Sequence, residues 1–116
     1  MSKIEEALAM CLELGRIIAQ TDEYKAMKKA EYDLLHDAEA RKMVENLQQL
    51  QVDQAKKQMS GIDLTEAEKK NLRETEQTAI QHPVVRASHM ANANFQEIMK
   101  EISKKIREGI KVHSVE

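Results

Sequence analysis

The sequence of 116 residues has few of the residues that interrupt helices and few of those that build catalytic sites. It contains one proline, three glycines, one cysteine and no tryptophan. The single cysteine, Cys11, excludes an internal disulfide and fits a reducing compartment. No stretch approaches about 18 apolar residues, and charges at Glu5, Glu13 and Arg16 argue against a signal peptide. We therefore expect a soluble cytoplasmic protein.

Motifs for catalysis, cofactors and metals are also missing. The sequence has no glycine-rich phosphate loop and no zinc-ligand spacing. His82 and His89 would lie roughly 10 Å apart along a helix, too far to share one ion. Asp33 and His36 have the i, i+3 spacing of a carboxylate-bridged metal site, but such a site needs more acidic ligands and a second copy of the motif. We expect no catalytic residue, no cofactor and no metal, and predict that the protein is not an enzyme.

Charge and apolar content set the class of protein. Charged residues make up 33% of the chain and are interspersed, which argues against disorder. The net charge of −2 differs from the strongly basic balance of most nucleic-acid-binding domains. Ile, Leu, Val and Phe together number 25 of 116 residues, which is close to the level at which a chain struggles to fold alone. We infer that a second copy completes the apolar surfaces of this chain, and we expect a homodimer.

Helix-favouring residues fill almost the whole chain and predict an all-α fold, an elongated bundle of about four to five helices. The predicted helices cover residues 3–20, a segment after Thr21, and residues 38–60, 66–81 and 83–110. Thr65 with Glu68 has the pattern of a capping box, Gly61 ends the helix before it, and Pro83 starts the last helix. The sequence leaves open whether the second and third helices are continuous. We predict a single helical domain over residues 1–110 and a frayed tail over residues 111–116.

The last predicted helix carries the most regular apolar stripe. Its apolar positions alternate by four and three residues, which is the spacing of a coiled coil. The predicted self-association residues are Ala91, Phe95, Ile98, Met99, Ile102 and Ile106. Gly15, at the centre of the apolar face of the first helix, costs roughly 1 kcal/mol relative to alanine, which indicates close approach of another helix.

Two polar segments are further candidates for binding. After Leu50 the core-facing positions of the third helix become Gln51, Gln54 and Gln58, so that this end is expected to project from the core or to meet a partner through polar contacts. The end of the last helix carries a basic cluster. Its members are Lys100, Lys104, Lys105, Arg107 and Lys111. Such a cluster suits the negative end of a helix dipole, and it also supports an alternative function as a nucleic-acid-associated module.

Several short motifs, in order, resemble the YlbF/YmcA family of small helical bacterial proteins, which includes the YheA-like members. They are residues 14–24 (LGRIIAQTDEY), 35–40 (LHDAEA), 47–51 (LQQLQ), 61–64 (GIDL) and 82–85 (HPVV), and Phe95 lies where the family keeps an apolar residue. The resemblance implies an all-helical, usually dimeric protein. It covers nearly the whole chain, from about residue 4 to residue 110.

The resemblance also implies a type of function. Some family members are non-enzymatic regulators of competence, sporulation and biofilm development, and form a complex that influences messenger-RNA processing by ribonuclease Y. Members of that complex hold iron–sulfur clusters on cysteines, a role that does not carry over to a chain with Cys11 alone. The leading hypothesis is therefore a protein that acts through contacts with itself, with related proteins or with the RNA-processing machinery.

Overall fold

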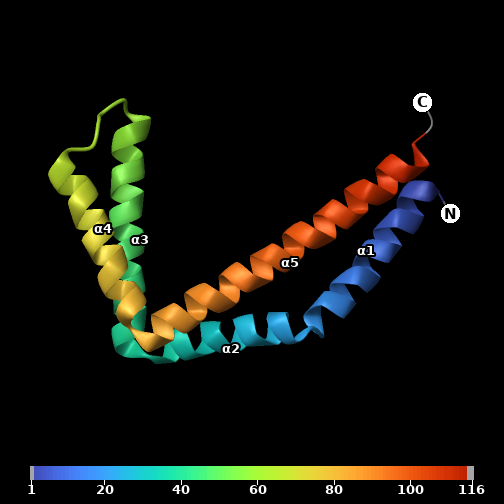
Figure 1. The fold of residues 1–116 in the computed structure, drawn as a ribbon, viewed down its shortest axis with the longest axis horizontal. Helices are drawn as coiled ribbons and strands as arrows, with labels where there is room; N and C mark the ends of the chain where they lie inside the picture. Colours follow the sequence, from blue (N-terminus) through green and yellow to red (C-terminus); the bar gives the residue numbers. More distant parts are fainter. Residues whose placement is uncertain (1, 115–116) are drawn as a thin grey trace. The chain divides into compact units, whose positions relative to one another are not determined.

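The computed structural model describes residues 2–114, and every regular element in that range is a helix (Figure 1). The five helices are α1 (Lys3–Ala19), α2 (Asp22–His36), α3 (Ala38–Met59), α4 (Glu66–Gln81) and α5 (Pro83–His113). The predicted all-α fold class is confirmed. The predicted bounds of α4 agree with the structure at both ends, because each end carries a strong local signal.

The helices begin where side-chain caps satisfy free backbone amides. The Ser2 hydroxyl accepts the Glu5 N–H at 3.1 Å, and the Thr21 hydroxyl accepts the Tyr24 N–H at 3.2 Å. At the start of α4, Thr65 and Glu68 form a complete capping box, in which each side chain accepts the backbone N–H of the other residue at 3.1 Å. These local hydrogen bonds explain why the sequence alone locates the helix starts.

The backbone conformations of three residues show where the chain leaves one helix and enters the next. Asp37 has an extended backbone (φ −106°, ψ 107°), so that α2 and α3 are separate helices, which answers the question left open by the sequence. His82 is also extended (φ −71°, ψ 124°), and Pro83 follows it as the first residue of α5. Gly61, which follows the C-cap residue Ser60 at the end of α3, adopts φ 77°, a left-handed conformation that favours glycine.

The helices group into two compact units. Unit 1 contains α1, α2 as far as Lys29, and α5 from Ala91 onwards. Unit 2 contains the end of α2 from Ala30, all of α3 and α4, and α5 as far as Met90. Each of α2 and α5 thus begins in one unit and ends in the other. The single domain expected from the sequence stays a prediction.

Unit 2 closes a small core at the junction of its helices. Ala40 near the start of α3, Ala79 near the end of α4 and Val85 in the first turn of α5 are 0%, 3% and 7% exposed. Small side chains at these positions allow the helix backbones to approach closely. The partly buried hydrophobic residues packed around them are Leu34, Met43, Val44, Leu47 and Val84. The α3–α4 hairpin (Figure 1) is therefore anchored at the end that meets α5.

The other end of the hairpin is joined through polar contacts. Gln54 of α3 is only 5% exposed, and its Nε2 donates a hydrogen bond to the backbone carbonyl of Glu68 in α4 at 2.9 Å. Lys57 Nζ lies 2.6 Å from the Glu68 carboxylate. The apolar pattern fades along α3 because these contacts replace it. Gln54 is thus held within the hairpin, whereas Gln51 and Gln58 are exposed.

The last helix continues to His113, three residues beyond the predicted end at Ile110. A ring nitrogen of His113 lies 2.9 Å from the carbonyl oxygen of Gly109, and the Ser114 hydroxyl donates to the carbonyl of Ile110 at 3.1 Å. The Ser114 contact satisfies one of the carbonyls that the last turn leaves free, and the His113 contact adds a side chain to the last turn of the helix. Of the predicted frayed tail, residues 111–113 are helical, and residues 115 and 116 lie outside the described residues.

Candidate self-association surface

Unit 1 differs from unit 2 in having no buried residue among those that the structure describes. Both units consist of amphipathic helices, and α5 has the strongest segregation of apolar and polar faces in the chain. Eight large hydrophobic side chains of unit 1 are nonetheless exposed. They are Ile4, Leu8, Met10, Leu12, Ile17, Ile106, Ile110 and Val112. The apolar faces of unit 1 are therefore only partly covered within one copy of the chain.

The predicted self-association residues lie on one side of α5 in unit 1. Five of the six, Ala91, Phe95, Ile98, Met99 and Ile102, are half-buried, whereas Ile106 is exposed. The Phe95 ring packs against the Tyr24 ring of α2, with the ring centroids 5.6 Å apart and the planes tilted by 60°. This tilted geometry is favourable for aromatic pairs. The structure thus brings the predicted stripe together and leaves part of each side chain accessible.

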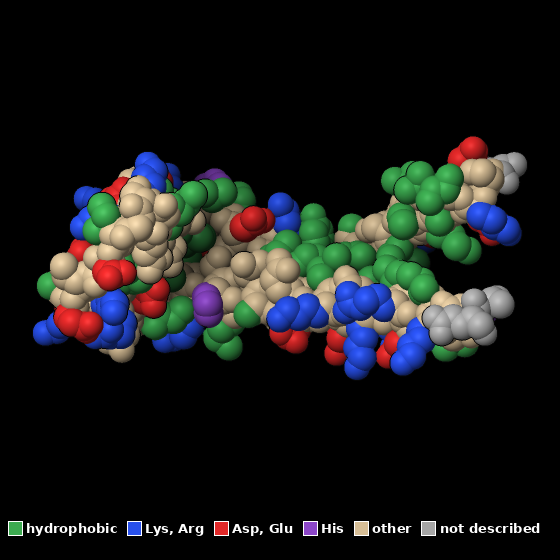
Figure 2. Space-filling view, turned by 90° about the horizontal axis from the view of Figure 1, so that it is seen from above, with side chains coloured by type: hydrophobic (Ala, Val, Ile, Leu, Met, Phe, Trp, Pro, Cys, Tyr) green, Lys and Arg blue, Asp and Glu red, His purple; other side chains and the backbone are tan. Residues whose placement is uncertain are grey.

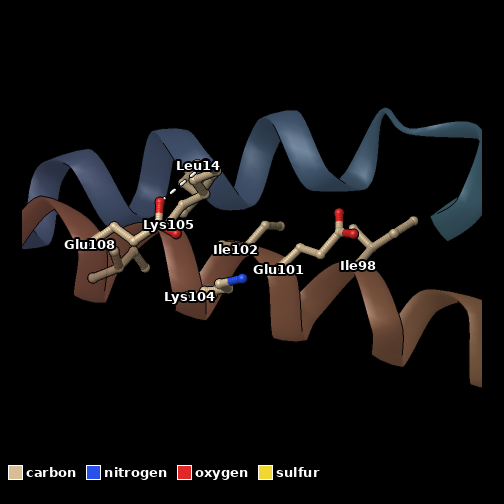
Figure 3. Close-up of a pocket in the computed structure, with 8 residues that line it drawn as sticks. Leu14, Ile98, Glu101, Ile102, Lys104, Lys105 and Glu108 are labelled. Carbon is tan, nitrogen blue, oxygen red and sulfur yellow. Dashed lines mark hydrogen bonds and ion pairs between the residues drawn. The ribbon is translucent and has the colours of Figure 1, made fainter.

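A hollow of about 660 Å³ lies beside this stripe, between α5 and Leu14 of α1 (Figure 3). Its floor is apolar, and its edges carry charges of both signs. The apolar residues are Leu14, Ile98, Ile102 and Ile106, and the charged ones are Glu101, Lys104, Lys105 and Glu108. An apolar floor with a polar rim is typical of protein interfaces.

The exposed face of α1 extends this apolar surface. Leu14 and Ile18 are half-buried, whereas Ile4 and Leu12 are 67% and 80% exposed. Figure 2 shows hydrophobic side chains gathered along α1 and along α5 in unit 1. A Cβ atom at Gly15 would meet nothing within 4 Å among the described residues, so none of the five helices of this copy makes the predicted close approach. The predicted self-association residues all lie on α5, although the same apolar periodicity is visible in residues 4–18.

Ion pairs neutralise part of the charge around this surface. Lys100 pairs with Glu97 at 3.2 Å, and Lys105 pairs with Glu108 at 3.1 Å. These pairs reduce the basic character of the cluster at the end of α5. On α1 the hydrogen bond from the Arg16 guanidinium lowers the pKa of the Glu13 carboxyl below its usual range. The rim is thus a mixed-charge surface rather than a basic one.

The residues that could act as nucleophiles or metal ligands lie apart from one another in the structure. Cys11 is exposed, and His36 stacks on Tyr32 with the ring centroids 3.8 Å apart. Among the residues described, His, Cys, Asp and Glu side chains form no group of three or more that could hold a metal ion. Within the same residues, no helix has the length and apolar character needed to cross a bilayer. The apolar faces of unit 1 are the feature that calls for a functional explanation.

Comparison with known proteins decides the family. The sequence model described as "Control of competence regulator ComK, YlbF/YmcA" matches residues 7–111. The chain belongs to the YlbF/YmcA family. The predicted resemblance is therefore confirmed over almost the whole chain.

Proteins from several bacteria are similar to this chain. A UPF0342 protein from Alkalihalophilus pseudofirmus is 32% identical over 98 residues, which are 84% of this chain and 83% of the relative. A UPF0342 protein from Levilactobacillus brevis is 26% identical over 102 residues, 88% of this chain and 90% of the relative. A solved protein of unknown function (DUF964) from Bacillus stearothermophilus aligns with a TM-score of 0.79 at 18% identity, covering 89% of this chain and 90% of the other. This last similarity supports the fold alone.

Proposed function

We propose that this member of the YlbF/YmcA family is a non-enzymatic regulator that acts through protein–protein contact, and that unit 1 associates with a second copy of the chain. The observation that carries the proposal is the contrast in burial between the two units. Among the residues that the structure describes, unit 2 encloses a core, whereas unit 1 encloses no residue and exposes eight large hydrophobic side chains. Contiguous apolar surfaces on soluble proteins commonly mark interaction sites.

The energetics of association agree with this proposal. Full burial of a large aliphatic side chain contributes about 1.5–3 kcal/mol, so that half-burial of eight would contribute about 6–12 kcal/mol. Association costs about 4–15 kcal/mol in lost translational and rotational freedom. The two ranges overlap, so the gain from burying the apolar surface of unit 1 is of the same size as the cost of association.

A second copy is the partner that the charges favour. The rim of the hollow carries two acidic and two basic residues, Glu101, Glu108, Lys104 and Lys105. In a two-fold symmetric contact each copy presents the same patch, so that a surface must complement itself. A rim with both signs can do so, whereas a rim of one sign would repel its copy. Gly15 offers space where a helix of the other copy can approach α1 closely.

The regulatory part of the proposal rests on the family, whose model is described as control of the competence regulator ComK. The test is deletion of the gene in the organism that encodes it, followed by complementation. We expect deletion to change the ComK level or the transformation frequency, and the wild-type gene to restore it. Unchanged ComK and unchanged transformation after deletion would contradict the regulatory role, while leaving self-association to be judged on purified protein.

A matched pair of variants links association to regulation. Ile102→Glu places a charge on the self-association stripe, whereas Asn94→Glu adds the same charge at an exposed position on the same helix. We expect Asn94→Glu to complement the deletion and Ile102→Glu to fail at equal protein level. Equal complementation by both variants would separate the regulatory role from association through α5.

A further inference from the structure

In unit 2 the side chains of Asp37 and His82 bring together the α2–α3 junction and the α4–α5 junction. Asp37 ends α2 and starts α3, and His82 ends α4 and starts α5. The His82 Nε2 lies 3.9 Å from Asp37 Oδ1, and the two side chains are only 14% and 35% exposed. The three buried core residues, Ala40, Ala79 and Val85, each lie within three residues of one of these two positions. The pair is therefore beside the part of the molecule that is packed most closely.

Each member of the pair caps the helix that it starts. Asp37 Oδ1 accepts the Ala40 N–H at 2.9 Å. His82 Nδ1 accepts the Val84 N–H at 3.2 Å, so that an imidazole takes the place of the usual Ser, Thr, Asp or Asn cap. A nitrogen that accepts a hydrogen bond must carry a lone pair, which places the proton of the neutral ring on Nε2. The same ring thus caps α5 with one nitrogen and presents an N–H toward Asp37 with the other.

Protonation of the ring would change the first of these contacts. A histidine takes up its second proton near neutral pH, and both ring nitrogens are then donors. Nδ1 can no longer accept from Val84, whereas Nε2 then carries part of a positive charge beside a carboxylate. Protonation of His82 therefore removes its cap on the Val84 N–H and creates an ion pair with Asp37, while both side chains keep their positions.

Other charged groups at this junction have different contacts or are exposed. The His36 ring faces the carbonyl of Tyr32 at 2.9 Å, and Arg41 donates to the carbonyl of Leu35 and pairs with Glu45. The first turn of α3 also carries Glu39, the first turn of α5 is followed by Arg86, and α2 carries Asp33 one turn before the junction. The last turn of α4 has no basic residue and the first turn of α5 no acidic one. Asp37 is the charged group that the structure pairs with His82.

We propose that His82 is a proton-dependent connector between α3 and α5. In the neutral form its Nδ1 caps the first turn of α5, and in the protonated form the ring releases the Val84 N–H and pairs with Asp37 at the start of α3. This device concerns unit 2 and is independent of the self-association of unit 1. It makes the capping of the first turn of α5 depend on the protonation state of the His82 ring.

The test is nuclear magnetic resonance of the full chain, following the Val84 amide and the His82 ring during a pH titration. We expect the Val84 amide shift to follow the titration of the His82 ring, and the neutral ring to show a lone pair at Nδ1. A Val84 amide that does not respond to the ring titration, or a neutral ring protonated at Nδ1, would overturn the proposal. This measurement needs no substitution, so it does not depend on the folding of a variant.

Two substitutions separate the functions of the two ring nitrogens. The amide oxygen of His82→Asn lies at the Nδ1 position and retains a cap, whereas His82→Gln reaches toward the Nε2 position and lacks it. At one neutral pH we expect the Val84 amide to exchange about tenfold faster in His82→Gln than in His82→Asn or the wild type, the factor that corresponds to a cap of about 1.4 kcal/mol. His89→Asn, at an exposed histidine of α5, serves as the control and should leave Val84 unchanged. Equal exchange in the Asn and Gln variants would contradict the capping role of Nδ1.

The contact with Asp37 is tested by Asp37→Asn, which keeps an oxygen to cap Ala40 and removes the charge. We expect this variant to melt at the same temperature as the wild type when His82 is neutral, and at a lower temperature when the ring is protonated. Identical melting temperatures at both pH values would overturn the ion-pair half of the proposal.

Discussion

Unit 2 and unit 1 are built from the same kinds of helix, yet across residues 2–114 the buried side chains all lie in unit 2. Unit 2 has small residues, Ala40 and Ala79, where its helices cross, and polar contacts from Gln54 and Lys57 where the apolar pattern ends. Unit 1 has large side chains along α1 and α5, which leave a hollow between them. The difference indicates that small residues at crossing points, rather than a strong apolar stripe, decide which part of this chain packs by itself.

The largest effect is expected from a charge on the apolar stripe of unit 1. Ile102→Glu should weaken association by about 3–5 kcal/mol, because the interface would bury an unpaired charge. This corresponds to a more than hundredfold increase in Kd. Sedimentation velocity of Ile102→Glu beside Asn94→Glu checks it, and equal masses for the two variants would show that the stripe is not the contact.

Removing the Phe95 ring should destabilise unit 1 by a smaller amount. Phe95→Ala removes the ring that packs against Tyr24 and should cost about 3 kcal/mol, the lower end of the range for buried phenylalanine, because Phe95 is half-buried within one copy. Chemical denaturation at several protein concentrations measures the loss. We expect the loss to grow with protein concentration if the ring also contributes to the interface, and a constant loss would assign the ring to unit 1 alone.

Overpacking the core of unit 2 should destabilise the protein by the same amount at every protein concentration. Ala40→Leu inserts a larger side chain at a position with no exposed surface, and should lower the free energy of unfolding by about 1–3 kcal/mol. The loss should be independent of protein concentration, because the site lies within one copy. Denaturation at two concentrations checks this, and a concentration-dependent loss would place unit 2 in the interface as well.

The smallest expected effect is the loss of stability of the α3–α4 hairpin at acid pH. The hydrogen bond from Lys57, followed by that from the Thr65 backbone, lowers the pKa of Glu68 below its usual value of about 4.3. A carboxyl whose pKa is lowered on folding stabilises the fold above its unfolded pKa, and this contribution is lost as the pH falls through the folded value. Thermal melts of the wild type should therefore decline more steeply below pH of about 4.3 than those of Glu68→Gln. Parallel declines would exclude this contribution.

Local signals made most of the fold predictable. Thr65, Gly61 and Pro83 act within a few residues of their own positions, so the limits of α4 follow from sequence. The predicted end of α5 lies three residues before the observed one, because the side chains of His113 and Ser114 contact backbone carbonyls in a way that no periodicity reveals. The burial of Gln54 depends on its hydrogen bond to Glu68, fourteen residues further along the chain. The sequence pattern around Gln54 does not predict this contact.

The candidate site was predictable only in part. The apolar spacing of α5 located the stripe from Ala91 to Ile106, because period alone defines the face of a helix. The exposed residues of α1, such as Leu8 and Leu12, had the same periodicity, but sequence does not say which of two apolar faces is left uncovered. That property depends on how α1 and α5 approach each other, which is a tertiary contact.

Amide hydrogen exchange at two protein concentrations, one below and one above the association midpoint, shows whether a second copy covers unit 1. Because each amide reports on its own position, the measurement separates the two units of the same molecule. We expect exchange in α1 and in α5 from Ala91 onwards to slow markedly at the higher concentration, and exchange in α3 and α4 to stay unchanged. Concentration-independent protection of α1 and α5 would contradict the claim that a second copy completes unit 1.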